Sequence, residues 1–215
     1  MARVLVKDST LTSIADAIRE KTGTTETLKP GEMADAISSM GNGNAELIGY
    51  LNTKKLSNEQ ANELLEEIAA DYSNTYGENT VAIGDYFFYH QYNITDIIIP
   101  DEIDFYSYGV FQSCYKLANV RFSANTRVID SGAFQHTSLE TVTLPESTKR
   151  LGSYAFASIE TLKTVCFKGT LDKIESNTFS NCKALTNIYV PWAEGAVANA
   201  PWGATNATIH YNYKE

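Results

Sequence analysis

Hydrophobic residues recur at a nearly fixed spacing in the second half of the chain, from residue 81 onward. Each unit of about 23 residues has an apolar residue, a Phe five positions later, and a Leu or Ile five or six positions after that. A short segment of alternating apolar and polar residues follows. The Phe positions are Phe88, Phe111, Phe134, Phe156 and Phe179, and the Leu or Ile positions are Ile94, Leu117, Leu139, Leu162 and Leu185. The alternating segments turn two sets of residues inward, first Ile97, Val120, Val142, Val165 and Ile188, then Ile99, Phe122, Leu144, Phe167 and Val190.

This repeating pattern predicts a solenoid. One unit alone exposes its Phe and Leu to water, whereas units stacked at the strand spacing of about 4.8 Å join these residues into one core. We therefore predict five stacked repeats over residues 81–190. The local register is open at Phe105–Tyr108, where aromatic residues replace the usual apolar residue, and at Ala124–Arg127, where the turn lacks Pro.

Short helices are predicted at the start of the chain. Two groups of apolar residues in residues 1–45 have helical spacing, namely Leu11, Ile14, Ala15 and Ile18, and then Met33, Ala34 and Ile37 after Pro30. Isolated helices this short are marginal in water, so we expect them to pack on each other or on a partner chain. Residues 1–45 are therefore predicted to be a helical attachment segment that ends at a hinge, Gly41–Asn44.

A third helix is predicted to begin after Ser57. Ser57 and Gln60 match a capping box, in which each side chain bonds the backbone N–H of the other residue. The apolar face of this helix consists of Ala61, Leu64, Leu65 and Ile68, and Leu56 is placed to pack on it. We expect residues 46–80 to cover the open N-terminal end of the solenoid, since exposed strand edges need such a lid.

The charge and hydropathy of the chain exclude two classes of partner. The formal net charge of -9 and the pI of about 4.9 repel phosphate backbones, and no basic cluster compensates. No stretch approaches the roughly 18 uninterrupted apolar residues of a membrane helix, and residues 1–10 carry charges where a signal peptide has its apolar region. We therefore expect no nucleic acid, no membrane insertion and no signal peptide.

The sequence gives no support for catalysis. His90, His136 and His210 occupy different repeat positions, without a partner at the spacing of a metal site or a nucleophile–base pair. Cys114 and Cys182 share one repeat position but lie three repeats apart, roughly 14 Å, well beyond the disulfide limit of about 7 Å. We expect reduced, buried thiols at these two positions, a more accessible thiol at Cys166, and no enzyme activity, metal or cofactor.

The outward positions of the alternating segments form a candidate binding face, because solenoids commonly bind ligands on an exposed sheet. The candidate ligand-binding residues are Asp96, Ile98, Asn119, Arg121, Thr141, Thr143, Thr164 and Tyr189. A sheet that is merely solvated is the alternative.

Aromatic residues are concentrated at both ends of the repeats. A candidate aromatic patch consists of Tyr89, Tyr92, Tyr106 and Tyr108, since tyrosine offers contact area at low entropic cost and suits sugar faces or protein loops. Trp192 and Trp202 frame the last segment, residues 191–215. With a final strand around Thr208–Tyr211, this segment is predicted to be a C-terminal cap.

The segment Ile129-Asp130-Ser131-Gly132-Ala133-Phe134, followed by Leu139-Glu140-Thr141-Val142-Thr143-Leu144-Pro145, resembles the leucine-rich repeat of the BspA-like type. The resemblance extends over about half of the chain. It implies an α+β fold in which a short helical N-terminal segment precedes a five-repeat leucine-rich-repeat solenoid with N- and C-terminal caps. For function it implies only varied adhesion and interaction roles.

The segments Ile14–Gly23 and Glu32–Ile37 resemble the N-terminal part of tail-associated proteins of phages that infect Gram-positive bacteria, and Pro191–Tyr211 resembles the end of such proteins. This resemblance implies a tail or baseplate protein of the virion, present in the host cytoplasm before lysis. Its partners would be other tail proteins, through residues 1–45, and a host-surface glycan or protein, through the repeats. The alternatives are a bacterial surface adhesin of the BspA-like class and a polysaccharide hydrolase with a site at the tyrosine-rich end. Assembly into a homo-oligomer is left open.

Overall fold

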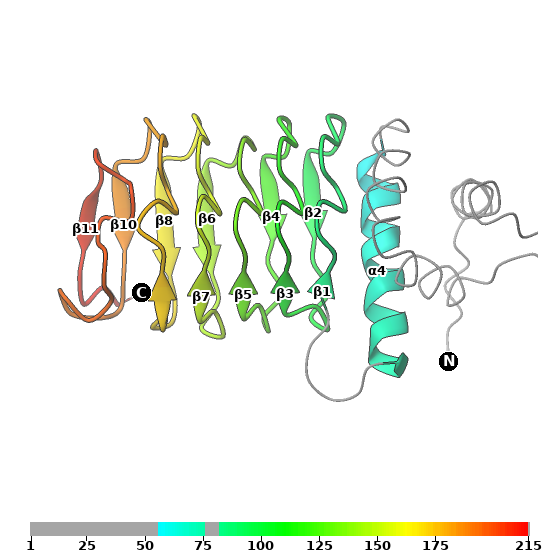
Figure 1. The fold of residues 1–215 in the computed structure, drawn as a ribbon, viewed down its shortest axis with the longest axis horizontal. Helices are drawn as coiled ribbons and strands as arrows, with labels where there is room; N and C mark the ends of the chain where they lie inside the picture. The colour runs from blue at the N-terminus through cyan, green and yellow to red at the C-terminus, as the bar shows by residue number, and fades with distance from the viewer. Residues whose placement is uncertain (1–55, 76–81, 215) are drawn as a thin grey trace, which may run out of the picture.

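Each repeat forms one turn of a solenoid and contributes a short strand to each of two sides (Figure 1). The computed structural model describes residues 56–75 and 82–214, so the helices predicted in residues 1–45 lie outside the described residues. One side is a five-stranded parallel sheet of β1 (Ala82–Ile83), β3 (Phe105–Tyr106), β5 (Val128–Ile129), β7 (Arg150–Leu151) and β9 (Lys173–Ile174). The other side, called the front face below, carries β2 (Asp96–Ile98), β4 (Asn119–Arg121), β6 (Thr141–Leu144), β8 (Thr164–Phe167), β10 (Asn187–Tyr189) and β11 (Thr208–His210).

The core confirms the predicted solenoid. All five Phe side chains of the repeat are fully buried and stack as a column through the core. Their ring centroids lie 5.1, 5.2, 5.3 and 5.8 Å apart from Phe88 to Phe179. Burying one such ring contributes roughly 1.5–3 kcal/mol, and each offset-stacked pair adds about 0.5–1.5 kcal/mol. The column therefore explains why the turns stack.

The five-stranded sheet gives the apolar residue that begins each unit a structural role. The sequence pattern places a column of apolar residues here but does not identify strands. In the structure Ile83, Tyr106, Ile129, Leu151 and Ile174 pair in parallel register and are buried. Strands of two residues are too short to give the period-two alternation by which strands are recognised in a sequence.

The repeat continues through both stretches whose register the sequence left open, Phe105–Tyr108 and Ala124–Arg127. Tyr106 lies in register with Ile83 and Ile129, so an aromatic ring fills the position of the aliphatic residue. Ser123 replaces Pro in the following turn, where the Thr126 N–H bonds the Ser123 carbonyl at 3.0 Å. The corresponding bond from Ile103 to Pro100 is 3.1 Å long, so the turn is preserved without Pro.

The front face differs from the prediction in two respects. β11, in the segment predicted as a cap, pairs with β10 and adds a sixth turn to the five repeats expected. Among the described residues, no strand pairing joins β4 to β6, so the front face consists of a β2–β4 pair and a β6–β8–β10–β11 sheet. Val120 and Phe122, predicted to point inward, pack against the core but are only partly buried.

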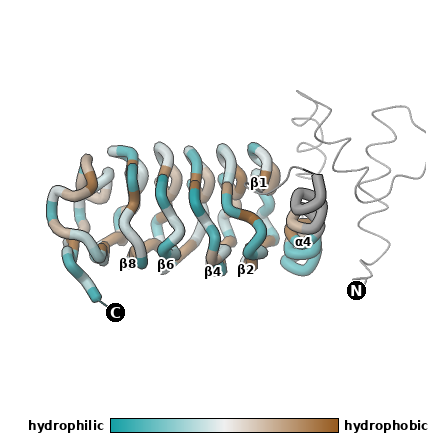
Figure 2. Tube along the Cα trace, turned by 90° about the horizontal axis from the view of Figure 1, so that it is seen from below, coloured by the Kyte–Doolittle hydropathy of each residue, from teal (hydrophilic) through white to brown (hydrophobic). Residues whose placement is uncertain are grey.

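Helix α4 (Asn58–Thr75) covers the N-terminal end of the solenoid, as predicted (Figures 1 and 2). The capping box is confirmed, with the Ser57 N–H bonded to Gln60 Oε1 at 3.0 Å and the Gln60 N–H bonded to Ser57 Oγ at 3.3 Å. The side chains of Leu56, Ala61, Leu64 and Leu65 are buried, whereas the side chain of Ile68 lies outside the described residues. No helix in the described ranges is long and apolar enough to cross a membrane.

Two asparagines of α4 supply the hydrogen bonds that β2 lacks as an edge strand. Asn58 Oδ1 accepts the Thr95 N–H at 2.7 Å, and Asn62 Oδ1 accepts the Ile98 N–H at 2.8 Å. Asn58 Nδ2 also donates to Thr95 Oγ1 at 2.8 Å. The helix thus takes the place of a preceding turn and satisfies backbone groups that would otherwise be free to pair with another chain.

Candidate functional site

The front face presents the predicted outward residues to solvent. Asp96, Ile98, Asn119, Arg121, Thr141 and Thr143 are exposed, and Thr164 and Tyr189 are half-buried. Figure 2 shows the alternation of hydrophilic and hydrophobic residues along this side. That these residues bind a ligand stays a prediction.

Some of these front-face residues already have partners within the chain. The Asp96 carboxylate accepts bonds from Thr95, Asn119 and Asn58, and these bonds lower its pKa. At the other end, the Tyr189 ring packs on His210 at 4.5 Å. Asp96 and Tyr189 are therefore in part structural.

The predicted aromatic patch is partly wrong. Tyr106 is fully buried in β3, where its hydroxyl bonds Thr126 Oγ1 and accepts the Ser123 N–H at 3.2 Å. Burial raises its pKa above the ordinary tyrosine value. Tyr106 has the aliphatic position in its repeat and therefore points into the core, away from the other tyrosines.

The three remaining patch residues lie on a third side of the solenoid. This side, called the turn face, consists of the segments that connect each strand of the five-stranded sheet to the next front-face strand, residues 84–95, 107–118, 130–140, 152–163 and 175–186. Tyr92 is 38% exposed and Tyr108 is 44% exposed, while Tyr89 is half-buried. The sequence identified the side chains but not the side of the molecule that they share.

Aromatic rings form a continuous series of contacts along the turn face. In order, the series runs Tyr108, Tyr86, Tyr89, His90, Tyr92, Tyr115 and His136, with centroid separations of 5.0, 5.3, 3.8, 5.4, 5.7 and 6.2 Å. We call these seven residues the aromatic track. Burial and a hydrogen bond with Tyr108 raise the pKa of Tyr86 to about 12, and burial lowers the pKa of His90.

The backbone of the turn face fixes where these rings point. The second residue after each column Phe has positive φ, at 59° for His90, 61° for Ser113 and 60° for His136. Histidine and asparagine tolerate this left-handed conformation better than most residues. Gly109 is also required, because a Cβ at this position would come within 2.6 Å of the Tyr86 ring.

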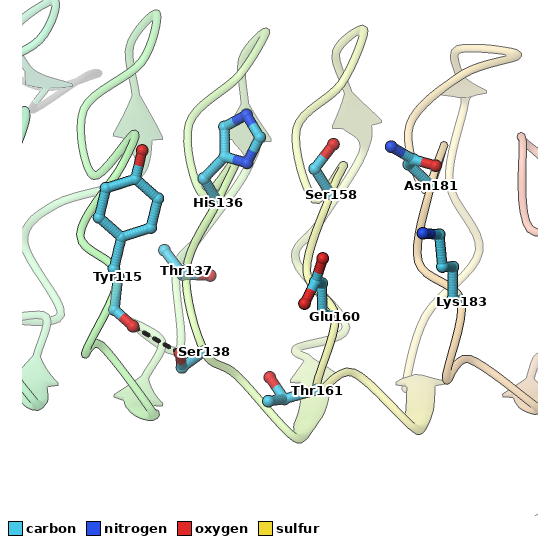
Figure 3. A pocket seen from close by; sticks show the side chains of 9 residues that line it. All are labelled: Tyr115, His136, Thr137, Ser138, Ser158, Glu160, Thr161, Asn181 and Lys183. Atoms are coloured by element: carbon cyan, nitrogen blue, oxygen red, sulfur yellow. Dashed lines mark hydrogen bonds between the residues drawn. The ribbon is translucent and has the colours of Figure 1, made fainter.

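A hollow of about 390 Å³ begins where the track ends. Its lining consists of Tyr115, His136, Thr137, Ser138, Ser158, Glu160, Thr161, Asn181 and Lys183 (Figure 3). In Figure 3 these side chains come from successive turns of the solenoid. Tyr115 is 51% exposed and forms one end of the hollow.

Sequence reasoning missed most of this hollow. The signal was present in two repeat columns, because Tyr92, Tyr115, Ser138, Glu160 and Lys183 follow one column and His90, Ser113, His136, Ser158 and Asn181 follow another. The first column lies four residues after each Phe or its equivalent and the second lies two residues after it. Neither column is apolar, so a search for core positions passes over both.

The titratable side chains of the described ranges bear on two kinds of site, metal centres and activated thiols. No group of three or more His, Cys, Asp or Glu side chains there is placed to hold a metal ion. None of the three cysteines forms a disulfide, and Cys114 and Cys182 are buried while Cys166 is partly exposed, as expected. Burial raises the pKa of Cys114 to about 12 and that of Cys182 to about 11, so neither thiol is activated.

The repeat of this fold is a known one. The sequence pattern of the BspA type leucine rich repeat region matches six copies across residues 81–196, more than half of the chain. The chain belongs to the BspA-type leucine-rich repeat family. Among curated proteins, none matches this leucine-rich repeat protein significantly.

Solved leucine-rich repeat structures resemble this BspA-type protein in fold. A leucine-rich repeat protein of T. pallidum is 22% identical, with a TM-score of 0.50, and the alignment covers 66% of this chain and 67% of that one. A leucine rich cell surface protein of Faecalibacterium prausnitzii is 26% identical, with a TM-score of 0.49 over 52% of this chain and 30% of that one. A leucine-rich repeat protein of Bacteroides ovatus is 26% identical, with a TM-score of 0.38 over 54% of this chain and 37% of that one. This chain thus matches about a third of the length of the latter two.

Proposed function

We propose that this protein is a non-catalytic recognition protein whose solenoid binds a glycan or a protein on a bacterial surface. The observation that carries the proposal is the aromatic track, in which exposed tyrosines form a connected surface along the turn face. Rigid aromatic side chains on a fixed backbone lose little entropy when a ligand binds. Membership of a repeat family associated with adhesion and interaction supports the same role.

We further propose that the solenoid is carried by a phage tail or baseplate and that residues 1–45 attach it there. The resemblance of residues 14–23 and 32–37 to phage tail-associated proteins supports this assignment. The protein would then be found in the virion, and in the host cytoplasm before lysis. The alternative, a bacterial surface protein of the same family, assigns the solenoid the same recognition role on a different carrier.

Surface binding is tested with the full chain on intact Gram-positive cells. We expect Tyr92→Ala together with Tyr115→Ala to reduce binding at least tenfold, because truncating two contact tyrosines removes on the order of 2 kcal/mol or more. The matched control is Thr141→Ala with Thr143→Ala on the front face, which should bind normally. Loss of binding in the control alone would instead assign the ligand to the front face.

The carrier is tested separately. Deletion of residues 1–45 should abolish incorporation into phage particles while the solenoid stays folded by circular dichroism. Unchanged incorporation would defeat the attachment role. Display on a bacterial surface in cells without phage genes would favour the adhesin.

A further inference from the structure

The hollow on the turn face lies where a row of stacked rings stops. In the repeat column that contains Tyr92 and Tyr115, the two phenol rings are 5.7 Å apart and nearly parallel, at 9°. The next turn has Ser138 at this position instead of a third ring. Besides Tyr92, the Tyr115 ring therefore contacts the tilted His136 ring, at 6.2 Å and 51°, and it stays half exposed. The Tyr115 ring therefore lies at one end of the hollow with open space beside it.

Polar side chains line the hollow, and the fold uses only some of them. The hydroxyls of Thr137, Ser138 and Thr161 each donate to a backbone carbonyl. In contrast, no hydrogen bond or ion pair within the described part of the chain engages the side chains of Ser158, Glu160, Asn181 and Lys183. A carboxylate, an ammonium group, an amide and a hydroxyl thus converge on one space without partners (Figure 3).

One other Glu–Lys pair in the repeats has the spacing of Glu160 and Lys183 and does form an ion pair. Glu140 and Lys163 occupy neighbouring turns 23 residues apart and form an ion pair at 2.9 Å. Glu160 and Lys183 are also 23 residues apart and lie on neighbouring turns, yet they form no ion pair. Both side chains are exposed and free to bond a ligand.

Three of the backbone N–H groups around the hollow are used by the fold. The N–H groups of His136, Ser138 and Ser158 bond carbonyls of adjacent turns, at 3.1, 2.9 and 2.8 Å. The Lys183 carbonyl accepts Asn206 Nδ2 at 3.3 Å. An extended peptide that pairs through its main chain would find these groups occupied. The side chains of Glu160, Asn181 and Lys183, which have no partner within the described residues, suit a ligand with many hydroxyl groups.

We propose that this hollow binds one pyranose ring of an oligosaccharide, with a C–H face of the sugar against Tyr115 and its hydroxyl groups bonded to Glu160, Asn181 and Lys183. The inference rests on the proposed recognition function and names the ligand class of the turn face. Glu160 accepts hydroxyl hydrogens, Lys183 donates, and Asn181 does both. Adjacent sugars of the chain lie along the aromatic track toward Tyr92, since the turns follow one another at roughly the length of a sugar residue.

The test uses the full chain and oligosaccharides released from Gram-positive cell walls, with saturation-transfer difference NMR and calorimetry as readouts. A proline-rich octapeptide is the comparison ligand, because aromatic grooves also bind such peptides. We expect saturation of sugar C–H protons by the wild type, a drop of tenfold or more in affinity for Tyr115→Ala and for Glu160→Gln, and recovery of binding in Tyr115→Phe. Glu140→Gln is the matched control, since Glu140 is an exposed glutamate outside the hollow, and it should bind normally.

The outcomes separate this inference from the proposed function. No saturation of any oligosaccharide, or binding that Tyr115→Ala and Glu160→Gln leave unchanged, overturns the sugar site. Binding of the peptide alone, lost in Tyr115→Ala, also overturns it but leaves recognition through the turn face intact. Full binding of Tyr92→Ala/Tyr115→Ala to intact cells contradicts recognition through the turn face, and absence of wild-type binding to the cells contradicts the proposed function itself.

Discussion

Replacing the two asparagines of α4 with alanine should detach the helix from the edge of the solenoid. In Asn58→Ala the Thr95 N–H loses its acceptor at 2.7 Å, and in Asn62→Ala the Ile98 N–H loses its acceptor at 2.8 Å. No other strand pairs with β2 on this side in the described structure. Leu64 and Leu65 stay buried against the solenoid, so hydrophobic contact alone has to hold the helix in the double variant.

The size of the effect follows from these bonds. A donor left without a partner costs about 1–3 kcal/mol when it is buried. The bond to Thr95 is partly buried and the bond to Ile98 is exposed, so water replaces some of each lost bond and we expect about 1 kcal/mol or less from each substitution. The two residues lie one helical turn apart and bond the same strand, so their effects should be coupled rather than simply additive.

Native-state hydrogen exchange of the full chain measures this effect locally. The amides of Thr95 and Ile98 should exchange about fivefold faster in the corresponding single variants and faster still in the double variant. The control is Glu66→Ala, an exposed position on the same helix, which should leave both amides protected. Unchanged protection of Thr95 and Ile98 in the double variant would refute the idea that α4 completes the edge through its asparagines.

Three further substitutions or reactions test the core. Phe134→Ala should cost about 3–5 kcal/mol in urea unfolding, because the ring is fully buried between two stacked neighbours. Tyr106→Phe should cost about 1–3 kcal/mol by leaving the Ser123 N–H without its acceptor, and an unchanged unfolding midpoint would contradict this. Iodoacetamide at pH 8 should label Cys166 and spare Cys114, whose pKa is raised to about 12 by burial, as peptide mass spectrometry can show.

Much of the fold was predictable because large apolar residues recur at fixed positions in each repeat. The Phe column and the alternating front-face segments have unambiguous spacing, and their burial follows from the hydrophobic effect. The sixth turn was missed because Gly203, with Trp202 before it, stands where the other turns have Phe. The break between β4 and β6 depends on hydrogen bonds between turns, which residue types alone do not specify.

The candidate site was predictable only in part. The tyrosines could be listed, but the sequence alone did not show that Tyr106 substitutes for an aliphatic core residue while Tyr92 and Tyr115 point outward. Left-handed residues such as His136 turn the chain at each repeat and decide which neighbours meet. Glu160 and Lys183 look like ordinary surface charges until the turns are stacked, when they come to line one hollow.

Hydroxyl-radical footprinting of the full chain, with and without fragments of host cell wall, tests recognition by the turn face most directly. It reports the accessibility of individual side chains in one experiment. Protection of Tyr92, Tyr115 and Lys183, with Ile98 and Arg121 on the front face unchanged, is the predicted result. Protection confined to the front face, with Tyr92 and Tyr115 oxidised as fast as in the free protein, would contradict the account.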